Sequence, residues 1–389
     1  MLHITSGEPE PLHCPLSDSV RDASDSRIWQ SFEILQEARR SGDVGILLSR
    51  KAKIEEWLED DDEGPPREGG VSKHAGLQAA LGGILSRIAR WTGSIELHAE
   101  AVRLVSAFQN RVRSNRPPDD GETLRRADLH LGNTLTRQAY VTHDEATFGQ
   151  ARILLEEPIR LRLDGSFVTR DAASFRDLGD ALIGELHWKR EVAMDGKSIT
   201  VLRMAVQLFR DHFRKTPRES LHDEVNASLS SLATACAMTA RRLHLGESTY
   251  IDAAFGGRSK DDAIQGLVKS SLKRSRIVWD AYLARIQSDY KPCFRWVRSV
   301  SNIAFAALYC HLIDQENAEA GSLAETAFLS VTKLCGIERY CGYQRIFPAL
   351  DSDHLALDGG VQYSEKDHRY RWLVNVDGLN TLMKAVQNG

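Results

Sequence analysis

The sequence predicts an all-α protein, built as a right-handed solenoid of about five to six antiparallel helical hairpins with a short irregular C-terminal cap. A short turn followed by a small residue about eight positions later recurs at intervals of about 50 residues, as from Gly93 to Ala101 and from Gly246 to Ala254. Between the turns, apolar residues recur every three or four positions, the period of an amphipathic helix. Runs of the β-branched residues typical of strands are few. The turns are expected at Gly42, Gly93, His143, Gly196 and Gly246.

The N-terminal part of the chain predicts a disordered segment, an early helical pattern and a linker. Residues 1–25 are rich in Pro, Ser and Asp, a composition that favours disorder. The helical array is expected over residues 26–334. An acidic run that ends in Gly64-Pro65-Pro66 interrupts it, so a linker is expected over residues 59–72.

Three hairpins are expected next, each with a small residue where its two helices approach closely. The first helices are expected over 74–91, 123–141 and 174–192, and the second helices over 94–112, 145–161 and 198–213. The second helices carry Ala101, Ala151 and Ala205, where a larger side chain would force the helices apart.

The last part of the array departs from the even spacing. A fourth hairpin is expected from Ser220 with its turn at Gly246, followed by an insertion over residues 256–293 that contains a long helix from about Asp261 to Ile286. One more hairpin is expected over 294–312 and 322–334. Residues 335–389 lack the pattern and are interpreted as the cap, since a terminal repeat must cover an open apolar face.

Two units of the array resemble tetratricopeptide repeats of the divergent kind that accompany protease or signalling domains. A Leu-Gly pair in the first helix, an aromatic residue and an alanine in the second, and a closing proline carry the resemblance. In the clearer unit these are Leu131-Gly132-Asn133-Thr134-Leu135, Tyr140, Phe148, Ala151 and Pro158, and the other has Leu178-Gly179-Asp180-Ala181-Leu182, Ala205 and Pro217. The resemblance implies a TPR-like α-solenoid with a concave surface that binds a peptide or protein, and no catalysis.

Composition excludes several functional classes. The formal net charge of −4 leaves no global basic field to recruit nucleic acid. No apolar stretch is long enough to span a membrane, and the N-terminus lacks the pattern of a secretory signal. Six scattered cysteines favour reduced thiols, and we expect a cytoplasmic protein that does not bind membranes.

Two segments contain residue types that bind metals, but a simpler interpretation is favoured for each. Cys310 and His311, with Cys335 and Cys341, are residue types that bind zinc, but no C-x-x-C pair is present, so buried thiols are favoured. The acidic run Asp60-Asp61-Asp62-Glu63 resembles the aspartate-rich metal motif of terpene synthases. It leads directly into Gly64-Pro65-Pro66 and no second metal motif follows, so an acidic linker is favoured. No metal and no cofactor are expected.

Residues 258–298 carry the strongest charge asymmetry, which supports an alternative function. Lys269, Lys273 and Arg276 recur at helical spacing and, with Arg274, are candidates for binding nucleic acid or a phosphate ligand. Aromatic residues lie nearby in the sequence, a mixture that nucleic-acid sites use. The simpler interpretation, which we favour, is a solvated basic helix face whose aromatic residues belong to the core.

The function that the sequence favours is a non-enzymatic adaptor that binds a peptide or a helix of a partner protein. No motif around the histidines resembles a nucleophile elbow or a protease dyad, and no glycine-rich segment has the Gly-Lys-Ser/Thr of a phosphate loop. We expect the first helices of successive hairpins to line the binding surface. Candidate contact residues there are Arg137, Gln138, His187 and Arg190.

Overall fold

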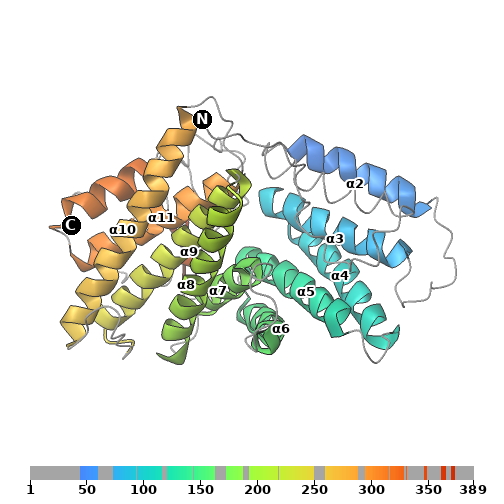
Figure 1. Ribbon diagram of the computed structural model, residues 1–389, viewed down its shortest axis with the longest axis horizontal. Helices are drawn as coiled ribbons and strands as arrows, with labels where there is room; N and C mark the ends of the chain where they lie inside the picture. The colour runs from blue at the N-terminus through green and yellow to red at the C-terminus, as the bar shows by residue number, and fades with distance from the viewer. Residues whose placement is uncertain are drawn as a thin grey trace.

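The computed structural model is a row of packed α-helices that follow one another in chain order, from α2 to α11 (Figure 1). It describes residues 44–327, apart from 60–72, 93, 116–120, 143, 163–171, 187–191, 218, 249–258, 288–293 and 315, together with residues 330, 346–347, 361–364 and 369–372. The disordered segment predicted over 1–25, nearly all of the linker predicted over 59–72 and most of the predicted cap lie outside these residues. The helices are α2 (Val44–Glu59), α3 (Lys73–Thr92), α4 (Ile95–Asn115), α5 (Gly121–Thr142), α6 (Glu145–Arg162), α7 (Ala172–Leu186), α8 (Val192–Lys215), α9 (Glu219–His244), α10 (Lys260–Ile286) and α11 (Phe294–Ile313).

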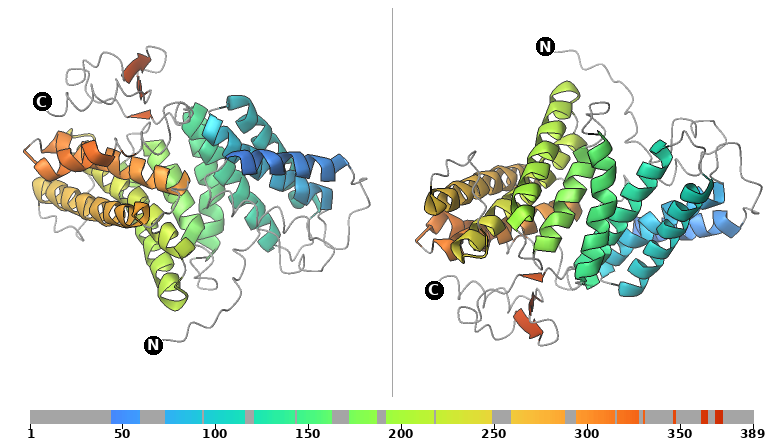
Figure 2. Two further views of the ribbon diagram at one scale, coloured as in Figure 1. Left: turned by 90° about the horizontal axis from the view of Figure 1, so that it is seen from above. Right: turned by 90° about the horizontal axis from the view of Figure 1, so that it is seen from below.

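Neighbouring helices pack against each other along the whole row, so the prediction of a helical protein with sequential packing is confirmed for the residues described. The odd-numbered helices α3, α5, α7, α9 and α11 make an additional set of contacts, because each also touches the next odd-numbered helix. We call these five helices the odd-helix layer. Helices α9 and α11 pack together as extensively as α9 and its sequence neighbour α10. Figure 2 shows the same row from above and from below.

All three alanines are buried as predicted, and a glycine of the preceding helix lies opposite two of them, Ala101 and Ala151. Ala101, Ala151 and Ala205 are completely buried. A Cβ added at Gly82 of α3 would lie 3.1 Å from the Ala101 carbonyl oxygen, and one added at Gly132 of α5 would lie 3.2 Å from that of Ala151. The same pairing of a glycine with an alanine therefore recurs in two successive helix pairs. It lets the two backbones of each pair approach closely.

The boundary between α7 and α8 differs from the prediction. A turn was expected at Gly196, but Gly196 lies inside α8, which begins at Val192, and α7 ends at Leu186. The first turn of α8 is held by Asp195, whose buried carboxylate accepts hydrogen bonds from Ser248 Oγ at 2.7 Å and Thr239 Oγ1 at 3.3 Å. These tertiary contacts outweigh the cost of a glycine inside a helix, about 1 kcal/mol.

The turn predicted at Gly246 is confirmed, with a backbone conformation that favours glycine. Gly246 has a φ of 75° and follows the C-terminus of α9. Its N–H donates to the Leu243 carbonyl at 3.0 Å, and the N–H of Glu247 donates to the Arg242 carbonyl at 2.7 Å. This pair of bonds is the Schellman arrangement that closes many helices.

The helix predicted inside an insertion is part of the packed row. Helix α10 begins at Lys260, after Ser259, whose hydroxyl accepts a hydrogen bond from the Asp262 N–H at 3.1 Å and caps the helix. It packs against α9 as closely as α4 packs against α3. Among the C-terminal residues described, three short antiparallel strands pair in the order β1-β3-β2: β1 (Ile346–Phe347), β2 (Val361–Ser364) and β3 (Arg369–Trp372).

The buried apolar residues form one large core and smaller clusters. The large core extends from α6 to α11 and reaches the short helical stretch that follows α11. A second core, which includes Ile54, Leu77 and Ile84, joins α2, α3 and α4. Only small clusters connect α4 with α5, through residues such as Phe108 and Leu135. Helix α5 therefore stands between the two larger apolar cores.

Candidate binding surface on the odd-helix layer

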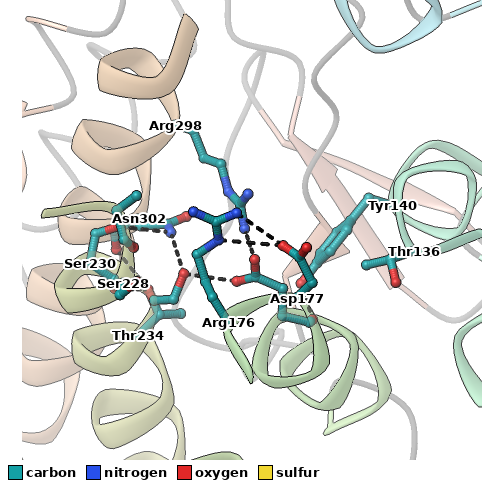
Figure 3. A network of polar contacts seen from close by, with 12 residues as sticks. Thr136, Tyr140, Arg176, Asp177, Ser228, Ser230, Thr234, Arg298 and Asn302 are labelled. Atoms are coloured by element: carbon teal, nitrogen blue, oxygen red, sulfur yellow. Dashed lines mark hydrogen bonds and ion pairs between the residues drawn. The ribbon is translucent and has the colours of Figure 1, made fainter. Parts of the chain in front are cut away.

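A network of charged and polar side chains crosses the odd-helix layer, with its centre on α7 (Figure 3). Arg176, Asp177 and Asp180 belong to one face of α7, because residues three and four apart on a helix are neighbours. From this face the network reaches α5 on one side and α9 and α11 on the other. We call it the α7 network.

Asp180 joins α7 to three other helices. Its carboxylate pairs with the Arg298 guanidinium of α11 and accepts a hydrogen bond from Ser231 Oγ of α9 at 2.8 Å. The backbone carbonyl of Asp180 accepts a further hydrogen bond from the Tyr140 hydroxyl of α5 at 2.7 Å. This single residue therefore fixes α7 relative to each of the other helices in the network.

Arg176 and Asp177 provide the second set of links. Arg176 pairs with Glu224 of α9 and, at 3.2 Å, with Asp177 Oδ1. Asp177 Oδ2 also accepts a hydrogen bond from Asn133 Nδ2 of α5 at 2.5 Å. The two carboxylates beside Arg176 thus neutralise the charge of a residue that is only 8% exposed.

Hydroxyl and amide groups extend the network between α9 and α11. Asn302 Nδ2 donates to Ser230 Oγ at 3.2 Å, and Thr234 Oγ1 donates to the Asn302 carbonyl at 3.1 Å. The side-chain oxygen of Asn302 is buried and has no hydrogen-bond partner among the residues described. These bonds account for part of the close packing of α9 against α11.

The charges in the network shift one another's pKa values in a consistent direction. Burial by itself would raise the pKa of Asp180, but Arg298 and Arg176 outweigh it and hold the pKa below its usual value. Burial by itself would lower the pKa of Arg176, but Glu224, Asp177 and Asp180 outweigh it and raise the pKa. Both groups are therefore charged at neutral pH, each stabilised by opposite charges.

Arg137 lies at the α5 edge of the α7 network and differs from the other arginines there. Its guanidinium donates one long hydrogen bond to Ser86 Oγ of α3 at 3.4 Å, and it forms no ion pair with any residue described. Burial lowers the pKa of Arg137. The attraction of Asp177 opposes this effect, whereas Arg298 and Arg176 lower the pKa further. Arg137 is thus a partly buried cation in positive surroundings.

His130 lies on the same helix, close to α3. A Cβ added at Gly83 of α3 would lie 3.4 Å from His130 Nε2, an ordinary van der Waals distance, so the ring lies directly beside this part of α3. Burial lowers the pKa of His130 to about 4, with further lowering by Arg137 and Arg87. The ring is therefore neutral at physiological pH and adds no charge beside Arg137.

The structure describes two of the four predicted contact residues. Arg137 and Gln138 are both partly buried on α5, in the odd-helix layer where the first helices were expected to line a surface. His187 and Arg190 lie outside the described residues.

The residues of the alternative site lie on α10. Lys269, Lys273 and Arg276 are exposed, and Arg276 pairs with Asp280 at 3.3 Å. Arg274 is partly buried and donates to the Ser270 carbonyl at 2.7 Å; burial lowers its pKa, and the nearby Arg203 and Arg210 lower it as well.

The aromatic residues near the basic helix are buried. Trp279, Tyr282 and Trp296 are each at most 8% exposed, and Tyr282 contacts both tryptophans, with ring centroids 5.3 Å and 6.0 Å apart. They pack within the large core. They therefore offer no surface on which a nucleic-acid base would stack beside the basic side chains of α10.

The described thiols are buried among apolar side chains. Cys236 and Cys310 are free cysteines with no exposed surface, and burial raises the pKa of Cys310 to about 12. Among the residues described, no group of three or more His, Cys, Asp and Glu side chains is arranged to hold a metal ion. A thiol in such surroundings stays protonated and unreactive at neutral pH.

Arg137 could be predicted from the sequence, but the α7 network beside it could not. The missed residues are Arg176, Asp177, Asp180, Glu224 and Arg298. One signal for them was present: Arg176, Asp177 and Asp180 alternate with Phe175, Leu178 and Leu182, which form an apolar pattern. Charged residues so close to a buried stripe need partners, and those partners come from helices distant in sequence.

None of the helices described combines the length and the apolarity that crossing a bilayer requires. The cytoplasmic location stays a prediction. No protein-family model matches this sequence, and no curated protein matches it significantly.

Proposed function

We propose that this chain is a non-enzymatic scaffold, a TPR-like α-solenoid that binds a peptide or a helix of a partner protein along the odd-helix layer. The observation that carries the proposal is the α7 network, which brings side chains of α5, α7, α9 and α11 together on one layer. Such a network positions the helices of a surface rigidly, and rigid surfaces bind with less loss of conformational entropy. The repeated approach of Gly82 to Ala101 and of Gly132 to Ala151 supports the repeat interpretation.

The test is a selection of random peptides, displayed on phage, against the immobilised full-length chain. We expect a family of related sequences to be enriched, and a synthetic peptide of that family to bind more weakly to Gln138→Ala. The matched control is Gln207→Ala on α8, which replaces an exposed glutamine of the even-numbered helices. Failure to enrich any sequence family, or equal weakening by the two variants, would count against binding on the odd-helix layer.

A second candidate is the binding of nucleic acid or a phosphate ligand by α10, because Lys269 and Lys273 are exposed on one face of that helix. A fluorescently labelled single-stranded RNA of random sequence tests it. Binding that weakens steeply with salt and disappears on reversing the charges of Lys269, Lys273 and Arg276 would favour this candidate. The absence of any binding at low salt would remove it.

A further inference from the structure

We infer that Arg137 binds an acidic side chain of the bound peptide, a carboxylate or a phosphorylated hydroxyl group. This inference rests on the proposed function, since it names the chemistry that the odd-helix layer recognises. Its basis is a difference between Arg137 and two nearby arginines of the α7 network, Arg176 and Arg298. Arg176 and Arg298 each have a carboxylate partner, whereas Arg137 forms no ion pair with the residues described.

The donor capacity of Arg137 is almost unused. A guanidinium presents five N–H donors in a planar fork that matches a carboxylate or a phosphate. The residues described provide one acceptor for this fork, Ser86 Oγ, at the long distance of 3.4 Å. An anion in front of Arg137 would therefore add charge-assisted hydrogen bonds without breaking an existing ion pair.

The nearby carboxylates do not fill this role. Asp177 is the acid that attracts Arg137, but its two oxygens already accept hydrogen bonds from Asn133 at 2.5 Å and from Arg176 at 3.2 Å. Asp180 is occupied by Arg298 and Ser231. The acids of the α7 network thus neutralise Arg176 and Arg298, and the charge of Arg137 is left in excess.

Arg137 is also accessible and correctly placed. It is partly exposed on α5, whereas Arg176 is buried on α7. Its neighbours toward α3 are Ser86, which is uncharged, and His130, which is neutral at physiological pH. A negative group that approaches this side of α5 meets a cation and hydrogen-bond donors but no competing acid among these neighbours.

The even-numbered helices offer a weaker candidate for the same chemistry. Arg276 is already paired with Asp280, and Arg274 donates to Ser270 of its own helix. Lys269 and Lys273 are exposed and hydrated, so an anion gains little there relative to water. The partly buried position of Arg137 makes the same contact stronger, because solvent screens it less.

The experiment repeats the phage selection with the full-length Arg137→Gln variant beside the wild type, with Lys273→Gln on α10 as the control that removes an equal charge. We expect Asp and Glu at a fixed position in peptides selected by the wild type and by Lys273→Gln, and loss of this preference with Arg137→Gln. For a synthetic selected peptide, replacing that acid by its amide should raise Kd by about tenfold to a hundredfold with the wild type, but by less than about threefold with Arg137→Gln.

A matched peptide with phosphoserine at that position separates the two sources of negative charge. Tighter binding of the phosphoserine peptide identifies a phosphorylated partner, and weaker binding identifies a carboxylate. Peptides that are enriched without any acidic preference, or whose acid is equally important with Arg137→Gln, would refute this inference and leave the proposed scaffold function standing. No enrichment with any of the proteins would refute both.

A stability measurement distinguishes a binding role from a structural one. Because Arg137 is a desolvated cation among other cations, Arg137→Gln should unfold at the same urea concentration as the wild type or at a higher one. A marked loss of stability would show that Arg137 supports the fold. If Arg137→Gln fails to fold, the contact can still be tested on the wild-type protein, by comparing its Kd for the acidic peptide with its Kd for the amide peptide.

Discussion

Asp180 shows how a single buried carboxylate organises this part of the protein. It is 4% exposed, yet it stays ionised because two guanidiniums lie beside it and a hydroxyl donates to it. A buried charge without such partners would cost several kcal/mol. The arrangement therefore stabilises the helices only as long as every member is present, and the loss of one member leaves another charge uncompensated.

Replacing Asp180 by Asn should destabilise the protein by about 3 kcal/mol, because Arg298 would lose its carboxylate partner in partly buried surroundings. Urea denaturation followed by circular dichroism measures the free energy of unfolding. Asp280→Asn is the matched control: it breaks the exposed pair with Arg276 and should change the stability by less than about 0.5 kcal/mol. If both variants changed the free energy of unfolding by similarly small amounts, the buried pair of Asp180 would be no more important for stability than the exposed pair of Asp280.

His130 should make the stability depend on pH. Its pKa is about 4 in the folded protein, against 6.5 for an ordinary histidine, so the unfolded chain binds this proton first as the pH falls. Stability from this residue is fully present above pH 6.5 and is lost as the pH falls toward 4, by at most about 3 kcal/mol. Urea denaturation between pH 7.5 and about 4.5 should show a shallower pH dependence for His130→Gln. An unchanged slope would mean that the ring is not desolvated.

At the scale of the elements, glycines at the crossings between helices determine how closely the helices pack. Gly82 and Gly132 lie where α3 and α5 meet the helices that follow them, and Gly184 of α7 lies against the ring of Phe148 of α6. Phe148 is buried and stacks edge-on against Tyr140, with ring centroids 4.9 Å apart. The ring has little freedom to move away, so the absence of a side chain at Gly184 is a packing requirement.

Gly184→Ala should therefore destabilise the protein by about 1–3 kcal/mol, since the new Cβ would lie 2.1 Å from a ring carbon of Phe148. Gly149→Ala in α6 is the control, and the opposite change in stability is expected for it. Its Cβ would meet nothing closer than Glu185 Oε1 at 3.8 Å, so the better helix propensity of alanine should stabilise the protein by about 0.5–1 kcal/mol. Thermal unfolding measures both variants. A rise in Tm for Gly184→Ala would contradict the packing derived for α6 and α7.

Periodicity in the sequence predicted the helices well where their boundaries are local. The helix expected over 123–141 is Gly121–Thr142, and the one over 145–161 is Glu145–Arg162. The start of α8 was missed because its first turn is stabilised by Ser248 and Thr239, which are distant in sequence. The same limit applies to the candidate site. Arg137 is predictable as a polar residue on a first helix. The pair of Arg298 with Asp180, in contrast, joins residues 118 positions apart, and no local sequence pattern predicts such a contact.

At the scale of the whole molecule, the two main cores divide the row of helices unequally. The large core runs continuously from α6 to α11, and the smaller one holds α2, α3 and α4 together. Between α4 and α5 the buried apolar residues form only small clusters. The α7 network lies mainly on the larger side of this division, and Arg137 lies at its boundary.

The direct link from Arg298 of α11 to Asp180 of α7 also has a mechanical consequence. Sliding α11 past α7 would break a buried ion pair and the hydrogen bonds between α9 and α11 together. Under tension, the half of the molecule from α7 to α11 therefore behaves as a stiff block.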